Sequence, residues 1–325
     1  MRTVQFREAL REAMSEEMRR DESVFLLGEE VAEYNGAYKV SQGMLDEFGA
    51  KRIIDTPIAE LGFAGIAVGA SMNGLRPIVE FMTWNFAILA ADQIINSAAK
   101  MLQMSGGQYH CPIVFRGGNG TAGQLAATHS QSFEAFYAHV PGLKVITPSN
   151  PADAKGLLKA AIRDNDPVVF LESEKMYGDK GEIPEGEYII PIGVADIKRK
   201  GSDVTIVSFG KIIKVAYEAA EVLQKEGISV EIIDLRTVRP IDYKTVVDSI
   251  KKTNLCVVVE ESRPLASISS EIAYHLQHYA FDYLDAPVYR VTQTDTPFAF
   301  SPTLIEAALP NVERIVAAVK ASMYR

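Results

Sequence analysis

The sequence predicts an α/β protein with two doubly wound domains, the second smaller than the first. Short apolar runs of strand length alternate with helical segments along nearly the whole chain, which is the pattern of parallel strands joined by helical crossovers. The alternation lapses around 177–190, where glycine, lysine, glutamate and proline predominate, and then resumes. A chain of 325 residues with 47% hydrophobic side chains is long enough for two ordinary cores. We therefore expect domains at 1–176 and 191–325, joined by a linker at 177–190.

The elements expected in the first domain begin with an amphipathic helix, because Phe6, Leu10, Met14 and Met18 recur at helical spacing. Its expected strands are 24–27, 52–55, 77–81, 113–116, 143–146 and 168–172. Its longest helices are expected at about 86–104 and at 151–164, the latter with proline in its first turn. The second domain is expected to contain strands at 204–208, 230–234, 256–260 and 288–291, with helices at 210–226, 242–252 and 267–279.

Composition excludes several classes of protein. No apolar run reaches membrane-spanning length without charges or glycines, and Glu8 and Glu12 interrupt the N-terminal segment, so it is no export signal. The formal net charge of −9 disfavours nucleic acid and anionic membranes as partners. Cys111 and Cys256 each begin an apolar run, which predicts buried reduced thiols. These features predict a cytoplasmic protein, or a protein of an organelle matrix or stroma after removal of a transit peptide.

One carboxylate, Glu60, lies in the otherwise apolar and glycine-rich part of the segment 55–65. Pro57 precedes it as a first-turn residue would, and an apolar face continues through Phe63 and Val68. A desolvated glutamate near a helix N-terminus either has a raised pKa or finds a polar partner, and both outcomes make it a candidate for proton chemistry. From the residues alone, a charge that only complements the helix dipole is an equal alternative.

The segment 55–65 resembles the pyrimidine-domain signature of thiamine diphosphate enzymes of the transketolase and 2-oxoacid dehydrogenase superfamily. Further segments that carry this resemblance are 80–86, 92–100, 112–117, 129–131 and 141–145. Together they most resemble the beta subunits of the decarboxylating component of pyruvate dehydrogenase. The resemblance implies a pyrimidine-type domain followed by a smaller transketolase C-terminal-like domain, in an α2β2 heterotetramer with an alpha subunit. It also implies oxidative decarboxylation of pyruvate and reductive acetylation of the lipoyl group of dihydrolipoyl acetyltransferase.

The resemblance also implies roles for individual residues. Glu60 would hydrogen-bond the ring nitrogen of the cofactor's aminopyrimidine and favour the tautomer that deprotonates the thiazolium carbon. Phe86 would pack against the aminopyrimidine, and Met82 would line that pocket. His129 would face the substrate end and take part in acyl transfer to the lipoyl group. His129 also lies in a polar segment without the apolar periodicity of a core histidine, and histidine titrates near neutral pH.

Two glycine motifs bear on how the cofactor is held. The family signature for diphosphate and Mg2+, Gly-Asp-Gly followed by a distant Asn, has no match, because Gly178-Asp179-Lys180 lacks the second glycine. The resemblance therefore implies that an alpha subunit holds most of the diphosphate and Mg2+. The segment 118–123 fits G-x-G-x-x-G, but no acidic residue ends the next expected strand, as a dinucleotide fingerprint requires. We expect an active-site loop there.

A structural ion is expected where the helix at 151–164 ends. Its last carbonyls lack intrahelical partners, and Asp164 and Asp166 add oxygens. The resemblance implies potassium, with the ligands Ile113, Ala161, Ile162, Asp164 and Asp166. The resemblance implies asparagine at position 166, so the aspartate found there leaves the identity and occupancy of the ion open. Solvated acids at a helix end are the alternative.

Three other functions stay open from the sequence. A beta subunit of a branched-chain 2-oxoacid or acetoin dehydrogenase would share most of the motifs. A self-sufficient transketolase-like enzyme is opposed by the missing diphosphate signature. The chain could also serve mainly in assembly, with Asp282, Asp285 and the C-terminal carboxylate docking a basic segment of the acyltransferase.

Overall fold

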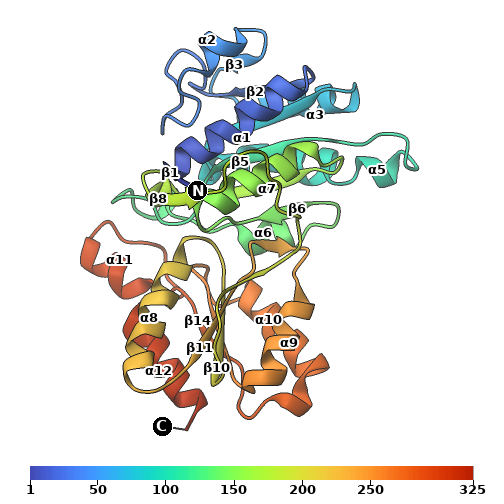
Figure 1. The fold of residues 1–325 in the computed structure, drawn as a ribbon. Coiled ribbons are helices and arrows are strands. Elements are labelled where there is room, and N and C mark those ends of the chain that lie inside the picture. The colour runs from blue at the N-terminus through green and yellow to red at the C-terminus, as the bar shows by residue number, and fades with distance from the viewer. Residues whose placement is uncertain (325) are drawn as a thin grey trace.

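Two parallel-sheet units lie one above the other in the computed structural model, which describes residues 1–324 (Figure 1). The N-terminal unit contains a seven-stranded sheet in the order β12-β6-β7-β5-β4-β2-β3, and the C-terminal unit a five-stranded sheet in the order β14-β13-β10-β11-β9. Strands β1 and β8 form a separate antiparallel pair. The strands are β1 Arg2–Gln5, β2 Val24–Gly28, β3 Ile53–Asp55, β4 Arg76–Thr83, β5 Val114–Gly118, β6 Lys144–Ile146, β7 Val168–Glu172, β8 Lys180–Ile183, β9 Asp196–Arg199, β10 Val204–Ser208, β11 Val230–Asp234, β12 Thr237–Arg239, β13 Cys256–Val259 and β14 Tyr289–Val291.

Helices cover both faces of the seven-stranded sheet. Neighbouring residues of one strand belong to different cores, since Leu26 packs with helices α1 and α7 while Leu27 packs with α3. The longer helices of this unit are α1 Phe6–Arg20, α3 Glu60–Met72 and α7 Pro151–Arg163. Its shorter elements are α2 Met44–Phe48, α4 Trp84–Ala87, η1 Ile88–Ala90, the π-helical turn η2 Gln93–Ala98, α5 Met101–Met104, η3 Ala127–His129, α6 Glu134–Ala138 and η4 Glu174–Met176.

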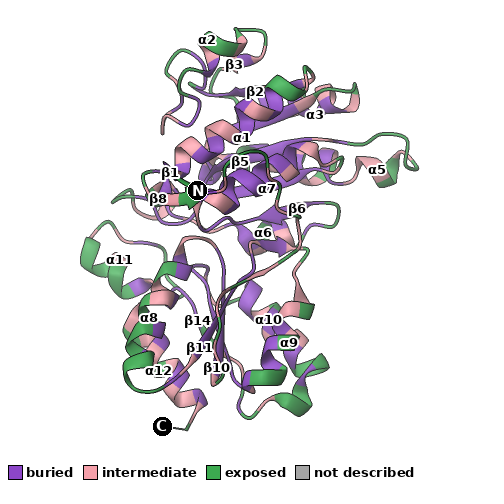
Figure 2. Ribbon diagram, in the orientation of Figure 1, coloured by how far each residue is buried: buried purple, intermediate pink, exposed green. Residues whose placement is uncertain are grey.

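The five-stranded sheet is covered in the same way, with α8 and α12 on one face and α9 and α10 on the other (Figure 1). Its helical elements are η5 Gly210–Ile212, α8 Ile213–Lys225, α9 Tyr243–Thr253, α10 Ile268–Tyr279, η6 Phe281–Tyr283, α11 Pro302–Ala308 and α12 Val312–Ser322. One hydrophobic core runs through both units, because Leu143 and Tyr137 of the first pack with Phe209 and Leu235 of the second. The strands are largely buried and the outer helix faces exposed (Figure 2). Two doubly wound units are therefore present, and the predicted fold class is confirmed.

Most predicted elements form close to their expected positions. Strands β7, β10 and β11 match the predicted ranges end to end. Both cysteines are buried free thiols, as expected, and burial raises the pKa of Cys256 to about 12. No helix within residues 1–324 combines the length and the apolar character needed to cross a bilayer. The domain boundaries at 176 and 191 stay predictions.

The predicted helix at 86–104 is wrong, because the chain there breaks into α4, η1, η2 and α5. Within it Ala99 N–H donates to the carbonyl of Ile94, which is π-type bonding over five residues. An apolar pattern cannot separate α, 3-10 and π turns, since all place side chains at similar intervals along one face. The linker at 177–190 is also not irregular throughout, because 180–183 forms β8 by pairing with β1 at the other end of the domain.

Candidate active site

The candidate site lies at the carboxyl ends of β2, β3, β4 and β5, which are neighbouring parallel strands. Glu29 directly follows β2, and Glu60 begins the helix after β3. Phe86 lies just beyond β4, and His129 lies in the segment that follows β5. Open α/β sheets bind ligands at this edge, because strand-end loops converge there. The topology therefore gathers residues that are up to 100 positions apart in the sequence.

Glu60 is the first residue of α3 and is only 4% exposed. It faces Glu29, which is also buried. Burial, the negative charge of Glu60 and a hydrogen bond to Glu60 together raise the pKa of Glu29 to about 7. Glu29 Oε1 has no hydrogen-bond partner among the described residues. The predicted burial of Glu60 is confirmed, and its polar partner is a second carboxyl group able to share a proton with it.

Glu29 was missed by the sequence reasoning. Its signal was its position two residues after the predicted strand 24–27, at the edge of the sheet where ligands bind. The dipeptide Glu29-Glu30 looks like ordinary surface charge, and only the fold shows that Glu29 is buried and Glu30 exposed.

Phe86 and His129 come together in the structure. Their ring centroids are 5.3 Å apart and the ring planes stand at 88°, which is an edge-to-face contact. Thr83 caps α4, since its Oγ1 accepts a hydrogen bond from Asn85 N–H at 3.1 Å, and this cap fixes the turn that presents Phe86. Phe86, Met82 and His129 are all partly exposed. They leave an accessible apolar surface at the strand ends.

The glycine-rich segment after β5 forms a loop and not the start of a long helix. Only the short η3, which contains His129, interrupts it between Gly118 and Phe133. A dinucleotide fingerprint needs a helix that opens at the glycines, so the structure agrees with the expected loop. His129 Nδ1 lies 3.0 Å from Thr128 Oγ1.

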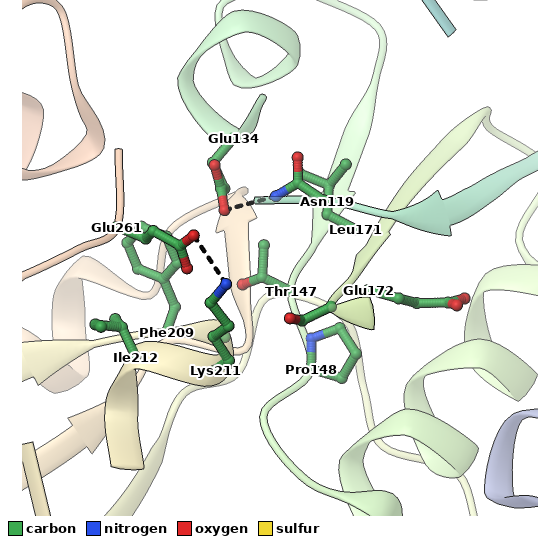
Figure 3. A pocket seen from close by; sticks show the side chains of 12 residues that line it. Asn119, Glu134, Thr147, Pro148, Leu171, Glu172, Phe209, Lys211, Ile212 and Glu261 are labelled. Atoms are coloured by element: carbon green, nitrogen blue, oxygen red, sulfur yellow. Dashed lines mark hydrogen bonds and ion pairs between the residues drawn. The ribbon is translucent and has the colours of Figure 1, made fainter. Parts of the chain in front are cut away.

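A small cavity of about 20 Å³ lies between the two units, next to the base of this loop (Figure 3). Glu134 lines it and is 7% exposed. Its Oε1 accepts a hydrogen bond from Asn119 Nδ2 at 2.9 Å, whereas its Oε2 has no partner among the described residues. Burial raises the pKa of Glu134 to about 8, and the nearby Glu261 and Glu260 add to the rise. Glu134 is therefore mostly protonated at neutral pH.

Glu134→Gln is expected to reduce the loss of stability at alkaline pH. A carboxyl group whose pKa is raised from 4.5 to about 8 in the folded state stabilises most below pH 4.5, and that contribution is lost as pH rises to about 8. Glutamine keeps the acceptor for Asn119 without ionising. Thermal unfolding between pH 6 and about 9 should show a shallower decline for the variant. Parallel curves for the variant and the unmodified chain would contradict a raised pKa at Glu134.

The expected ion ligands Ala161, Ile162, Asp164 and Asp166 lie in and just after the last turn of α7, and their role as ligands stays a prediction. Arg76 Nη1 donates to the carbonyls of Ile162 and Asp164 at 3.0 and 2.9 Å. Lys144 Nζ contacts the carboxylates of Asp164 at 2.7 Å and Asp166 at 3.0 Å. Ile113 lies directly before β5, and its carbonyl accepts from Val168 N–H at 2.9 Å.

These contacts bear on which ion the residues fit. Each carbonyl keeps a second lone pair beside its present donor, and Lys144 balances the charge that Asp166 adds. The set therefore fits a monovalent cation held by carbonyls, and fits poorly a divalent ion that requires free carboxylates. Within residues 1–324 no group of three or more His, Cys, Asp or Glu side chains is placed to hold a metal.

The residues expected in docking lie on the C-terminal unit. Asp282 and Asp285 are exposed, in and directly after η6. The C-terminal carboxylate belongs to residue 325, outside the described residues. Their docking role stays a prediction.

Comparison with known proteins gives consistent matches along the chain. Residues 2–180 match the family model "Transketolase, pyrimidine binding domain" and residues 193–315 match "Transketolase, C-terminal domain". The pyruvate dehydrogenase E1 component subunit beta of Rhizobium meliloti is 58% identical over 100% of this chain and 71% of its own length. The Rickettsia felis protein of the same name is 56% identical over 98% of both chains. A mitochondrial beta-2 subunit from Oryza sativa is 54% identical over 98% of this chain and 86% of its own.

A solved structure agrees on the fold. The chain described as "Split gene transketolase, inactive beta4 tetramer" superposes with a TM-score of 0.80 at 23% identity, covering 99% of this chain and 98% of that one. At this identity the likeness concerns the fold alone. The sequence matches show that the chain belongs to the family of pyruvate dehydrogenase E1 component beta subunits, built from transketolase pyrimidine-binding and C-terminal domains.

Proposed function

We propose that this chain provides the aminopyrimidine half of a thiamine diphosphate site and, with an alpha subunit, decarboxylates pyruvate and acetylates the lipoyl group of a dihydrolipoyl acetyltransferase. The observation that carries the proposal is the buried Glu60–Glu29 pair at a sheet edge that also presents Phe86. The relatives described above are pyruvate dehydrogenase subunits, which favours pyruvate over branched-chain 2-oxo acids or acetoin.

The side chains at the strand ends fit the aminopyrimidine half of the cofactor. Bound thiamine diphosphate supplies the electron sink that decarboxylation requires. In this proposal Glu60 would hold a proton at the ring nitrogen of the aminopyrimidine, and Glu29 would be the second group that shares this proton. Phe86 and Met82 offer a flat apolar wall that orients the ring and excludes water. In this proposal the alpha subunit holds most of the diphosphate and Mg2+.

Exposed apolar side chains beside the site support an alpha partner. Ile58 is 83%, Leu61 50% and Ile66 70% exposed on and before α3, and Ile88 and Leu89 are exposed on η1, which packs against α3. An extended apolar surface is costly in water and marks a protein interface. Glu60 begins the helix that carries part of this surface, so a subunit that covered the surface would also lie beside Glu60.

Calorimetry tests the half-site directly. Thiamine diphosphate with Mg2+ should bind tightly to the co-purified α/β assembly and not to this chain alone, and the assembly should release carbon dioxide from pyruvate. Tight binding by the single chain would mean that it holds the diphosphate itself, and the division of the site between subunits would be wrong.

His129→Ala is expected to impair acetylation of a lipoyl domain by about 10²- to 10⁴-fold, the usual range for losing a proton donor. Carbon dioxide release from pyruvate with an artificial oxidant should change much less, because His129 contacts the edge of Phe86 and has no contact with Glu60 among the interactions described above. Measuring both rates on the same assembly checks whether His129 serves acetylation and not decarboxylation. Equal losses in both assays would contradict it.

Potassium is the proposed ion at the end of α7, with the ligands Ile113, Ala161, Ile162, Asp164 and Asp166. The fit to a monovalent cation supports this choice, because Lys144 occupies the carboxylates and leaves carbonyl lone pairs. Thermal unfolding of the chain should therefore shift upward in potassium chloride relative to choline chloride at equal ionic strength. An identical midpoint in both salts would remove potassium from the proposal.

A further inference from the structure

Two paired residues of the C-terminal unit, Lys211 and Glu261 (Figure 3), contact Thr121 at the base of the loop that carries His129. Glu261 Oε1 accepts hydrogen bonds from Thr121 N–H at 2.5 Å and from Thr121 Oγ1 at 2.6 Å. Lys211 Nζ donates to the Thr121 carbonyl at 2.7 Å and also contacts Thr121 Oγ1. Lys211 and Glu261 pair with each other at 2.9 Å. Every polar group of Thr121 is therefore bound by this pair.

The position of the pair explains why it is available to the loop. Lys211 follows β10 and Glu261 follows β13, and these are hydrogen-bonded parallel strands. Their carboxyl ends form the crevice in which an open α/β sheet ordinarily takes its ligand. Here Thr121, 1% exposed, fills that place.

Gly120 shows how closely the two units approach. Its φ is +77°, and a Cβ added there would lie 2.9 Å from Glu261 Oε1. Only glycine adopts this backbone conformation readily and leaves the space that the carboxylate occupies.

The other end of the loop contacts the candidate active site, next to Phe86. Gly120 N–H donates to the carbonyl of Gln131 at 2.9 Å, which closes the loop between them. Gln131 N–H donates to Asn85 Oδ1 at 3.1 Å, and Asn85 directly precedes Phe86. His129, two residues before Gln131, then meets Phe86 edge-on. One continuous set of contacts therefore runs from Lys211 and Glu261 to His129.

We propose that Lys211 and Glu261 are positioning residues, which act from the C-terminal domain through Thr121 to hold the 119–131 loop and so place His129 for acyl transfer. The proposal rests on the proposed role of His129. In consequence, the C-terminal domain contributes to catalysis by fixing a loop of the other domain, without touching the cofactor.

Two variants test whether the contacts of Lys211 and Glu261 with Thr121 hold the loop. Lys211→Met removes the ammonium group, and Thr121→Val removes the hydroxyl while leaving the Lys211–Glu261 pair intact. Lys214→Met is the matched control, because Lys214 lies on the same helical segment but pairs with the partly exposed Asp179. Hydrogen exchange of the amides at 122–130, measured on the chain itself, should speed up about tenfold or more in both test variants and stay unchanged in the control.

Kinetics on the α/β assembly distinguish a positioning role of these residues from a general loss of structure. Both test variants should lower the kcat of lipoyl-domain acetylation by about tenfold or more, since small misplacements have such effects, while carbon dioxide release with an artificial oxidant stays within about twofold. In a His129→Ala background, Lys211→Met should cause no further loss of acetylation. If Lys211→Met fails to fold, the same exchange and acetylation measurements on Thr121→Val test the proposal.

Two results would overturn the proposal. One is unchanged exchange at 122–130 in Thr121→Val, and the other is a full additional loss when Lys211→Met is combined with His129→Ala. Failure of the proposed function looks different. In that case His129→Ala alone would leave acetylation intact, while the exchange measurement would still decide whether the C-terminal pair holds the loop.

Discussion

Glu60→Gln is expected to lower pyruvate decarboxylation by the α/β assembly by about a thousandfold or more. Glutamine keeps nearly the same shape but cannot exchange a proton with the aminopyrimidine ring nitrogen, and a positioned acid–base group commonly contributes 10²–10⁴-fold. Glu60 is buried at the first turn of α3 and faces only one other carboxyl group, Glu29, in the contacts described.

The control for this prediction is Glu33→Gln, a change of the same chemistry at an exposed glutamate of the same segment that follows β2. It should leave the rate unchanged. Calorimetry should show that Glu60→Gln still allows the assembly to bind cofactor, because Phe86 and Met82 are intact, so that the loss lies in kcat. Near-normal turnover by Glu60→Gln would remove Glu60 from the proposed mechanism.

The sequence predicted those features of the fold that depend on local patterns. The strands 168–172, 204–208 and 230–234 are continuous apolar runs buried on both faces, and runs of this kind identify central parallel strands without further context. Four short strands, β1, β8, β9 and β12, escaped prediction, and each pairs with a strand that is distant in the sequence. Thr237–Arg239 belongs to the second half of the chain but pairs antiparallel with Lys144–Ile146 of the first sheet. No local pattern encodes that pairing.

The candidate site was predictable to the extent that a motif marks it. Glu60, Phe86 and His129 lie in segments that resemble a known signature, and the structure places Phe86 against His129. Glu29, Lys211 and Glu261 carry no motif of their own. Each is a charged residue within three positions of the end of a strand, and its role becomes visible only when the sheet order shows which strand ends face one another. Strand-end charges therefore deserve testing as site candidates when a parallel sheet is predicted.

Arg116→Met is expected to be the most destabilising single substitution discussed for this chain. Arg116 is fully buried between two buried carboxylates, with Nε 2.6 Å from Glu172 Oε1 and Nη1 in contact with Glu80. Tyr177 completes the cluster by donating from its hydroxyl to Glu172 at 2.8 Å. Removing the one cation leaves two buried negative charges uncompensated, which typically costs about 3–5 kcal/mol. Chemical denaturation of the purified chain should show this loss in the free energy of unfolding.

The matched variant replaces the whole charge cluster. Because an apolar or neutral replacement of a complete buried ion cluster is often close to neutral, the triple variant Glu80→Gln, Arg116→Met, Glu172→Gln should recover much of the stability that Arg116→Met loses. A triple variant no more stable than the single one would show that Arg116 stabilises by packing and not by charge.

The pH dependence of Arg116→Met follows from the same cluster. Burial and the negative charge of Glu172 raise the pKa of Glu80, whereas the positive charge of Arg116 lowers it. Loss of Arg116 should therefore raise the pKa of Glu80 further. A carboxyl group with a raised folded-state pKa stabilises most when protonated in both states, and this contribution is lost as pH rises through the folded-state pKa. The deficit of the variant should therefore be smallest below the ordinary pKa of glutamate, about 4.3, and should grow as the pH rises towards 8. A deficit independent of pH would mean that Glu80 does not titrate in the folded variant, and the electrostatic account of this cluster would have to be replaced by one based on packing.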